Sequence, residues 1–258
     1  MKQLKFLLTI ATLALLFGAC NKENSTVLKT TQLSMQPGTA ARLVVEPNID
    51  GCTFVSSNGA IATVTTTGWV IAKQAGTVSI TVKKDNEDVG VCAVTIAGAY
   101  VEPYREPYLN FGATPSQIKT YETRTLLFED EDMLAYFGEN TYVDFVMYLL
   151  EDEVYTESAV LIPDNGPNKD LLLAFLNKKY IYDGEDEDII AFVSEDMKTA
   201  VIVLTADFME EVYHWAVYLD LEALLEGFLG SNKKSNLSNG LTTKEIREAV
   251  KKISQKVW

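Results

Sequence analysis

Apolar residues follow two different spacings along the chain, and the change between them divides the sequence into two regions. From residue 26 to 98, short stretches alternate apolar and polar side chains and are separated by glycine or asparagine. Such alternation at near-regular intervals is typical of half-buried strands in an all-β sandwich. The strands expected from this pattern are 41–45, 53–56, 62–66, 69–72, 77–83 and 89–96.

The second region, residues 111–229, combines helical and alternating spacing and contains an internal repeat. Residues 129–137 recur as 185–193, displaced by 56 positions, and the same displacement relates Thr114 to Asp170. Both of these residues are expected to cap the N-terminus of a helix. We therefore predict a two-layer α+β domain, in which a duplicated helix plus antiparallel strands forms one sheet with both helices on the same face. Each copy is expected to contribute three strands.

The N-terminus has the pattern of a secretory signal peptide. Lys2 and Lys5 precede an apolar run at 6–17, and Gly18-Ala19-Cys20 follows. The run is shorter than the roughly 20 residues that a transmembrane anchor needs. A cysteine directly after two small residues resembles the lipobox of bacterial lipoproteins. That resemblance implies removal of residues 1–19, lipidation of Cys20, a tether at 20–25 and membrane attachment through this lipid. We expect a cell-envelope location, in the outer membrane of a Gram-negative bacterium, facing the periplasm or the surface.

Four segments of the first region carry a second resemblance. They are FVSSN at 54–58, IATV at 61–64, GWVIA at 68–72 and GTVSITV at 76–82. Their order and spacing resemble the bacterial Ig-like domain of group 2 (BIG2). The resemblance implies that residues 26–98 form an Ig-like sandwich that serves as a spacer or adhesive unit without catalytic residues.

Cysteine and histidine counts limit the chemistry. Besides Cys20 the chain has Cys52 and Cys92, which in an extracytoplasmic protein indicate either a disulfide or two buried thiols. Since His214 is the single histidine, a histidine-rich zinc site is excluded. His214 lies in an alternating stretch and is expected to have a structural role.

Charge is distributed unevenly along the chain. The sequence has 36 acidic and 22 basic residues, and 28 of the acidic ones, against 7 basic ones, lie between Val101 and Gly230. This excess argues against nucleic acid as a partner, because phosphate backbones would be repelled. Proline-punctuated residues 99–110 are predicted to be a stiff linker, and residues 230–240 a flexible one. Residues 241–258 form a basic amphipathic helix in this prediction, which docks on the acidic body or on a partner helix.

Two acidic runs are the feature that most resembles a chemical site. The first consists of Glu129, Asp130, Glu131 and Asp132, and the second of Glu185, Asp186, Glu187 and Asp188. Clustered carboxylates are ligands for calcium, although their spacing is not that of an EF-hand loop. The alternative is a solvated acidic turn that was copied with the repeat. No other cofactor is expected.

The sequence contains no recognisable catalytic constellation, so we predict a non-catalytic protein. The leading hypothesis is binding or adhesion to a protein or glycan ligand. Tyr104, Tyr108, Trp215 and Tyr218 are candidates for a sugar-stacking surface, although aromatic residues on strands usually belong to a core. One alternative is a carboxylate-based, glycan-directed hydrolase, which needs two facing acids in a cleft. Another is an accessory lipoprotein of an envelope protein complex.

Overall fold

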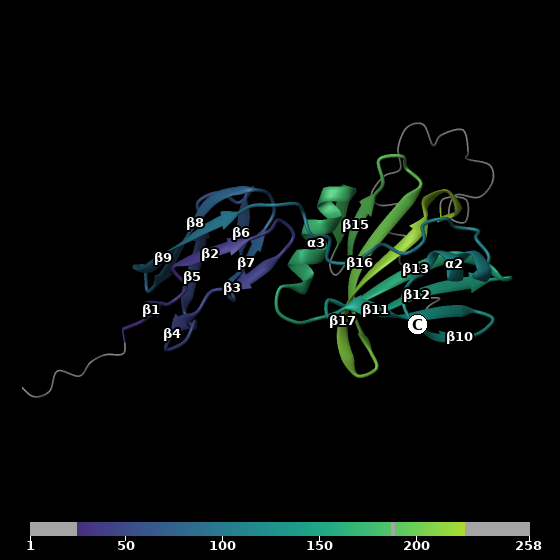
Figure 1. Cartoon of the computed structure of the whole chain (residues 1–258), viewed down its shortest axis with the longest axis horizontal. Coiled ribbons are helices and arrows are strands. Elements are labelled where there is room, and N and C mark those ends of the chain that lie inside the picture. The colour runs from purple at the N-terminus through teal and green to yellow at the C-terminus, as the bar shows by residue number, and fades with distance from the viewer. Residues whose placement is uncertain (1–24, 187–188, 225–258) are drawn as a thin grey trace, which may run out of the picture.

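The computed structural model describes residues 25–186 and 189–224 of the 258-residue chain. The predicted signal peptide (1–19), Cys20 with most of its tether, the linker 230–240 and the helix 241–258 lie outside the described residues, as do Glu187 and Asp188. The described residues form two groups of strands that follow each other along the chain. Figure 1 shows the two groups side by side, with helix α3 between them.

The first group is all-β, as the alternation predicts. Its strands are β1 (Val27–Leu28), β2 (Gln32–Met35), β3 (Ala40–Arg42), β4 (Val45–Glu46), β5 (Cys52–Ser56), β6 (Ala62–Val64), β7 (Trp69–Ala72), β8 (Gly76–Lys84) and β9 (Glu87–Ile96). They form a sheet of order β2-β9-β8-β5, a sheet of order β3-β7-β6 and the pair β1-β4. Every second residue of β8 points inward, and Val78, Ile80 and Val82 share one core with Ala62 and Val70 of the other sheet. The expected strand at 41–45 is interrupted, and its residues are divided between β3 and β4.

Of the two alternatives for Cys52 and Cys92, a disulfide or two thiols, the structure has the thiols, since both cysteines are free. Cys92 lies opposite Ile80, which in turn lies opposite Ser56, four residues along β5 from Cys52. At about 3.3 Å per residue and 4.8 Å per strand, the two Cα atoms are roughly 16 Å apart. A disulfide requires about 4.4–6.8 Å. Both residues contact the same core, but at different levels of it.

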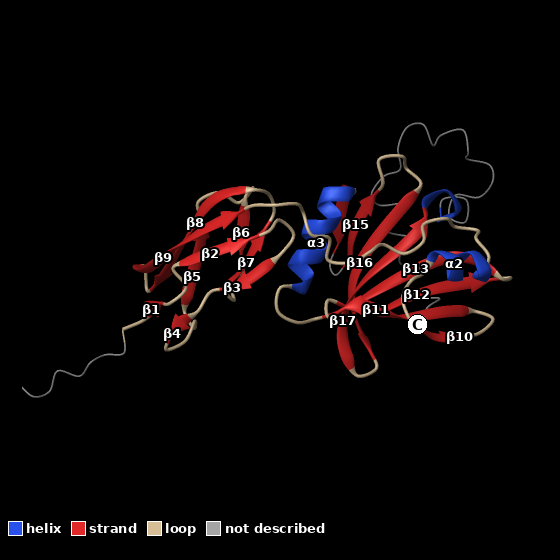
Figure 2. Cartoon of the chain, in the orientation of Figure 1, coloured by secondary structure: helices blue, strands red, loops and turns tan. Residues whose placement is uncertain are grey.

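The second group is built around one antiparallel sheet of eight strands, in the order β10-β11-β12-β13-β17-β16-β15-β14. Its elements are α2 (Pro115–Tyr121), β10 (Leu126–Glu129), β11 (Met133–Asn140), β12 (Val143–Glu151), β13 (Val154–Pro163), α3 (Asn168–Lys179), β14 (Ile181–Asp186), β15 (Ile189–Val193), β16 (Thr199–Phe208) and β17 (Glu211–Asp220). The chain therefore passes twice through a unit of one helix followed by four strands, rather than the three strands predicted (Figure 2). The last strands of the two units, β13 and β17, pair with each other and join the units. Residues 221–224 begin another helix.

The 56-residue displacement relates equivalent places in the two units. Residues 129–133 connect β10 to β11, and residues 185–189 connect β14 to β15. Thr114 caps α2 as predicted: Pro115 begins the helix, and the backbone N–H of Thr114 donates to Gln117 Oε1 at 2.9 Å. The prediction for Asp170 is wrong, because α3 begins at Asn168 and places Asp170 inside its first turn. A carboxylate in the first turn still suits the positive end of the helix dipole.

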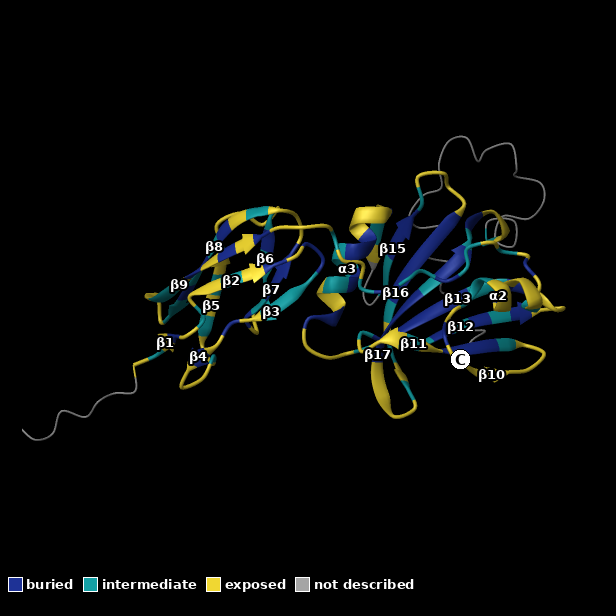
Figure 3. Cartoon of the chain, in the orientation of Figure 1, coloured by how far each residue is buried: buried dark blue, intermediate teal, exposed yellow. Residues whose placement is uncertain are grey.

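Both helices pack on the same face of the sheet. Ile118 of α2 and Leu172 and Phe175 of α3 share one core with residues of the central strands such as Val160 and Tyr218. Figure 3 shows the middle of these strands buried and the turns at their ends exposed.

The segment predicted as a linker belongs to this core. Tyr104 is 2% exposed, and its ring lies 4.8 Å from that of Phe175. Its hydroxyl and that of Tyr218 form a buried hydrogen bond of 2.6 Å. The backbone N–H of Tyr108 donates to the hydroxyl of Tyr148 at 2.8 Å. Residues 99–110 therefore do not act as a free spacer.

Candidate functional site

The first acidic run forms a turn at the tip of the β10–β11 hairpin. Asp130 Oδ1 accepts hydrogen bonds from the backbone N–H groups of Asp132 (3.0 Å) and Met133 (2.8 Å), which closes the turn in the way typical of aspartate. Glu129 forms an exposed ion pair with Lys119. Among the described residues, no three Asp, Glu, His or Cys side chains are arranged to hold a metal ion. A calcium site therefore remains a prediction without support from the described geometry.

The second run occupies the equivalent hairpin. Glu185 and Asp186 end β14 and Ile189 begins β15, with Glu187 and Asp188 outside the described residues. The equivalence of the two hairpins explains why the run occurs twice, since a duplicated unit repeats its turn.

His214 connects three segments of the second group. It is 3% exposed, with Nε2 2.9 Å from Asp164 Oδ1 and Nδ1 3.0 Å from Thr205 Oγ1. Burial lowers the pKa of His214 and outweighs the opposing effect of Asp164. A hydroxyl, an imidazole and a carboxylate also form hydrolytic triads, but there Nδ1 faces the carboxylate and Nε2 the nucleophile, the reverse of this arrangement. The geometry therefore favours the structural role that the sequence predicts.

A buried ion network lies where α2 ends, and sequence analysis did not identify it. The side chain of Arg124 is 2% exposed; its Nη1 lies 2.7 Å from Glu122 Oε1 and its Nε 2.7 Å from Glu139 Oε2. It also donates to the carbonyl of Arg105, and Tyr148 donates to Glu122. The network fixes the 99–110 segment and α2 to β11.

Electrostatics explains how this network tolerates burial. Burial alone would raise the pKa of Glu139, but hydrogen bonds from Arg124 and from the backbone of Arg105 lower it below its usual range. Likewise, burial would lower the pKa of Arg124, but Glu139 and Glu122 raise it. A glycosidase acid needs a carboxyl whose pKa is raised, so Glu139 has the opposite of the required property.

The four candidate sugar-stacking residues do not form a surface. Tyr104 and Tyr218 are buried beneath α3, and Trp215 is 5% exposed on the other face of the sheet. The ring of Tyr108 is partly buried and stacks on Tyr121 at 4.6 Å. All four side chains are used for packing.

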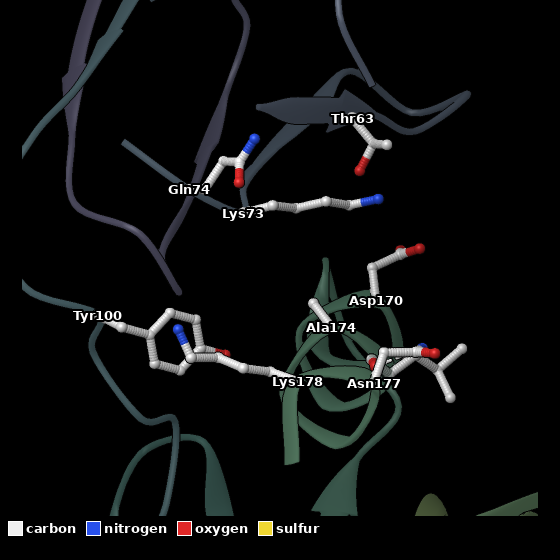
Figure 4. A pocket seen from close by; sticks show the side chains of 9 residues that line it. Thr63, Lys73, Gln74, Tyr100, Asp170, Ala174, Asn177 and Lys178 are labelled. Carbon is white, nitrogen blue, oxygen red and sulfur yellow. Dashed lines mark hydrogen bonds between the residues drawn. The ribbon is translucent and has the colours of Figure 1, made fainter. Parts of the chain in front are cut away.

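A polar cleft of about 550 Å³ lies between the first group and helix α3. Figure 4 shows Lys73 and Asp170 extending into it from opposite walls. The ammonium of Lys178 lies 4.0 Å above the ring of Tyr100. Close by, a Cβ added to Gly166 would lie 3.2 Å from the ring of Trp69, so the two groups touch there. These residues form a contact zone between the groups, and their chemistry selects no reaction.

An exposed apolar surface lies at the free edge of the large sheet at β10. All four residues of this strand are exposed, and three of them are large and apolar: Leu126 (42%), Leu127 (46%) and Phe128 (46%). Phe137 of the neighbouring strand is also 46% exposed, and its N–H donates to the carbonyl of Thr125. We call Leu126, Leu127, Phe128 and Phe137 the edge patch. Edge strands are usually protected by charge, proline or a cover, because their unpaired backbone groups attract other chains.

Arg124→Met is expected to destabilise the second group by about 3–5 kcal/mol, because Glu122 would be left buried without its main counter-charge. Its free energy of unfolding should be measured in urea. The matched control is Lys119→Met, which breaks an exposed pair and should cost less than about 1 kcal/mol. Adding Glu122→Gln to Arg124→Met should recover part of the loss. Equal losses for the two single variants would contradict this view of the network.

His214→Gln is expected to make stability less sensitive to acid between pH 7 and 5. Because the folded state lowers the pKa of His214, the unfolded chain binds more protons, so stability falls as the pH decreases through this range. In the variant, the slope of the free energy of unfolding against pH should be smaller by up to about 1.4 kcal/mol per pH unit. Urea unfolding at several pH values measures it, with Thr205→Val as a control that keeps the titrating ring. An unchanged slope in His214→Gln would show that the ring does not titrate differently on folding.

Comparison with known proteins does not assign the chain to a family. No protein-family model matches the chain, and no curated protein sequence matches it. Within residues 25–186 and 189–224, no helix is long and apolar enough to cross a membrane.

Proposed function

We propose that this chain is a lipid-anchored binding protein of the cell envelope that recognises a protein partner through the edge patch. Attachment through the lipid on Cys20 is supported by the basic, apolar and small-residue order of the first twenty positions. An outer-membrane location in a Gram-negative bacterium, facing the periplasm or the surface, belongs to the same proposal.

In this proposal residues 26–98 are a bacterial Ig-like group 2 spacer that presents an α+β domain. The four sequence segments at 54–82 support the Ig-like assignment, as does the single core shared by two sheets. The α+β assignment is supported by two helices that share a core with one face of the eight-stranded sheet. Within the spacer, Trp69 approaches Gly166, which lies two residues before α3.

The observation that carries the proposal is the exposed apolar edge of β10. Strand addition to such an edge gives affinity through main-chain hydrogen bonds, and exposed side chains give specificity. Leu126 and Leu127 are aliphatic, which suits a protein better than a glycan, because sugars stack on aromatic rings. The acidic turn at 129–132 lies directly beside the patch. The expected partner is therefore an extended segment with apolar side chains and basic neighbours.

The alternatives differ in their support. An accessory lipoprotein of an envelope complex is a form of the same proposal, since its partner is also a protein. A glycan-directed hydrolase finds less support, because the candidate stacking residues are used for packing.

Site-specific photo-cross-linking in cells that produce the full chain tests the proposal. A photoreactive residue at Leu127 should give a defined protein adduct, whereas the same residue at Val55 should not. Val55 is a matched control, because it is a 55%-exposed apolar residue on β5, an edge strand of the other group. Phe128→Lys should reduce the Leu127 adduct at least about tenfold. Cys20→Ala should release the chain from the membrane fraction.

Two results would contradict the proposal. Equal cross-linking from Leu127 and Val55 would show that the edge patch is not selective. An adduct formed only with a second, epitope-tagged copy of the chain would make the edge a self-association surface.

A further inference from the structure

The sheet face opposite α2 and α3 is composed like the interior of a protein. Strand register places three rows of six residues on it, from β11 across to β15. The rows are Phe137, Phe145, Leu161, Trp215, Leu204, Ile189; then Ala135, Met147, Ala159, Val217, Ile202, Ala191; then Met133, Leu149, Glu157, Leu219, Ala200, Val193. Seventeen of these eighteen residues are apolar, and Glu157 is the exception. We call this surface the second face.

The residues of the second face are buried or partly buried, except Phe137 at its β11 end, which is 46% exposed. Leu161, Ala200 and Ile202 are no more than 1% exposed. Yet α2 and α3 pack on the other face. An apolar sheet face of this size is not left in water by soluble domains. The second face therefore requires a cover.

The chain itself turns onto this face after the last strand. Residues 221–224 begin a helix, and Leu221 and Leu224 pack with Ala191, Ile202 and Leu219 of the second face. Thirty-four residues follow this turn.

We propose that residues 242–258 form a helix that packs across the second face of its own chain. Ile246, Val250, Ile253 and Val257 recur at helical spacing and form one apolar stripe. Gln255 and most of the charged residues lie away from that stripe. The sheet is then covered by helices on both faces.

Dimensions and charge fit this assignment. A 17-residue helix is about 25 Å long, and six strands span about 24 Å from the first to the last. The 17 residues from 225 to 241 can extend to nearly 60 Å, so the connection is long enough. Residues 242–258 carry five basic and two acidic residues, whereas residues 101–230 carry 28 acidic and 7 basic ones. Attraction between them supports docking, and the covalent tether raises the local concentration above that of a separate partner.

The test uses the full chain with a cysteine replacing Met147 on the second face. In the chain that carries only Met147→Cys, this thiol should react slowly with a maleimide. Cys52 serves as an internal reference. Ile253→Asp, on the stripe, should accelerate labelling at 147 at least about tenfold and lower the melting temperature by about 5 °C or more. Gln255→Asp introduces the same charge on the opposite side of the helix and should change neither.

A truncated chain that ends at residue 241 extends the test. When it also carries Met147→Cys, its thiol at position 147 should react rapidly with the maleimide. An added peptide with the sequence of residues 242–258 should restore the protection. Equal labelling in Ile253→Asp and Gln255→Asp would overturn the proposal. Protection that is lost on dilution would also overturn it, because the cover would then come from a second copy. Phe137 belongs to both surfaces, so the edge patch is tested separately, by cross-linking at Leu127 of β10.

Discussion

The pairing of β13 with β17 is the constraint on which the second group depends. These are the last strands of the two units, and seven residue pairs join them, from Glu157 with Leu219 to Pro163 with Tyr213. Side chains alternate between the faces of a strand, so this register decides which residues of all eight strands share a face. A slip by one residue would move Tyr218 away from the helices and Trp215 toward them.

Several features follow from this pairing. Because the units meet at their last strands, their first strands, β10 and β14, become the two edges of the sheet. The edge patch is exposed for this reason. Both helices lie on one face of this sheet, with the β13–β17 pair between the two units. The opposite face keeps its apolar rows, for which residues 242–258 are the cover that we propose. That cover would leave the β10 edge exposed as an apolar surface for a partner.

Sequence patterns predicted the elements of both groups better than their contacts. Alternation in Val78-Ser79-Ile80-Thr81-Val82 indicated β8, and the repeat of 129–137 at 185–193 indicated the duplicated hairpin. Residues 147–150 are continuously apolar because this strand packs on both faces, with Tyr148 on the helix side and Met147 on the second face. The sequence could not decide between a disulfide and two thiols at Cys52 and Cys92, because a shared core does not fix the level at which each cysteine lies.

The candidate site was harder to predict, since it depends on sheet order. Leu126, Leu127 and Phe128 have the composition of a core strand, and only the position of β10 at an edge exposes them. Tyr104 shows the opposite case, because its proline-rich surroundings indicate a linker although its ring fills the core. Clustered carboxylates in the two acidic runs suggest a calcium site, but the first run closes a turn.

The most direct test of this account is an NMR measurement of contacts between α-protons of β13 and β17. In an antiparallel pair, close α-proton contacts occur at every second residue pair. The account predicts them either at the set that includes Ala159 with Val217 or at the set that includes Val160 with Ala216. Contacts shifted by one residue, or no contacts between these strands, would contradict a single sheet and with it the exposed edge and the second face.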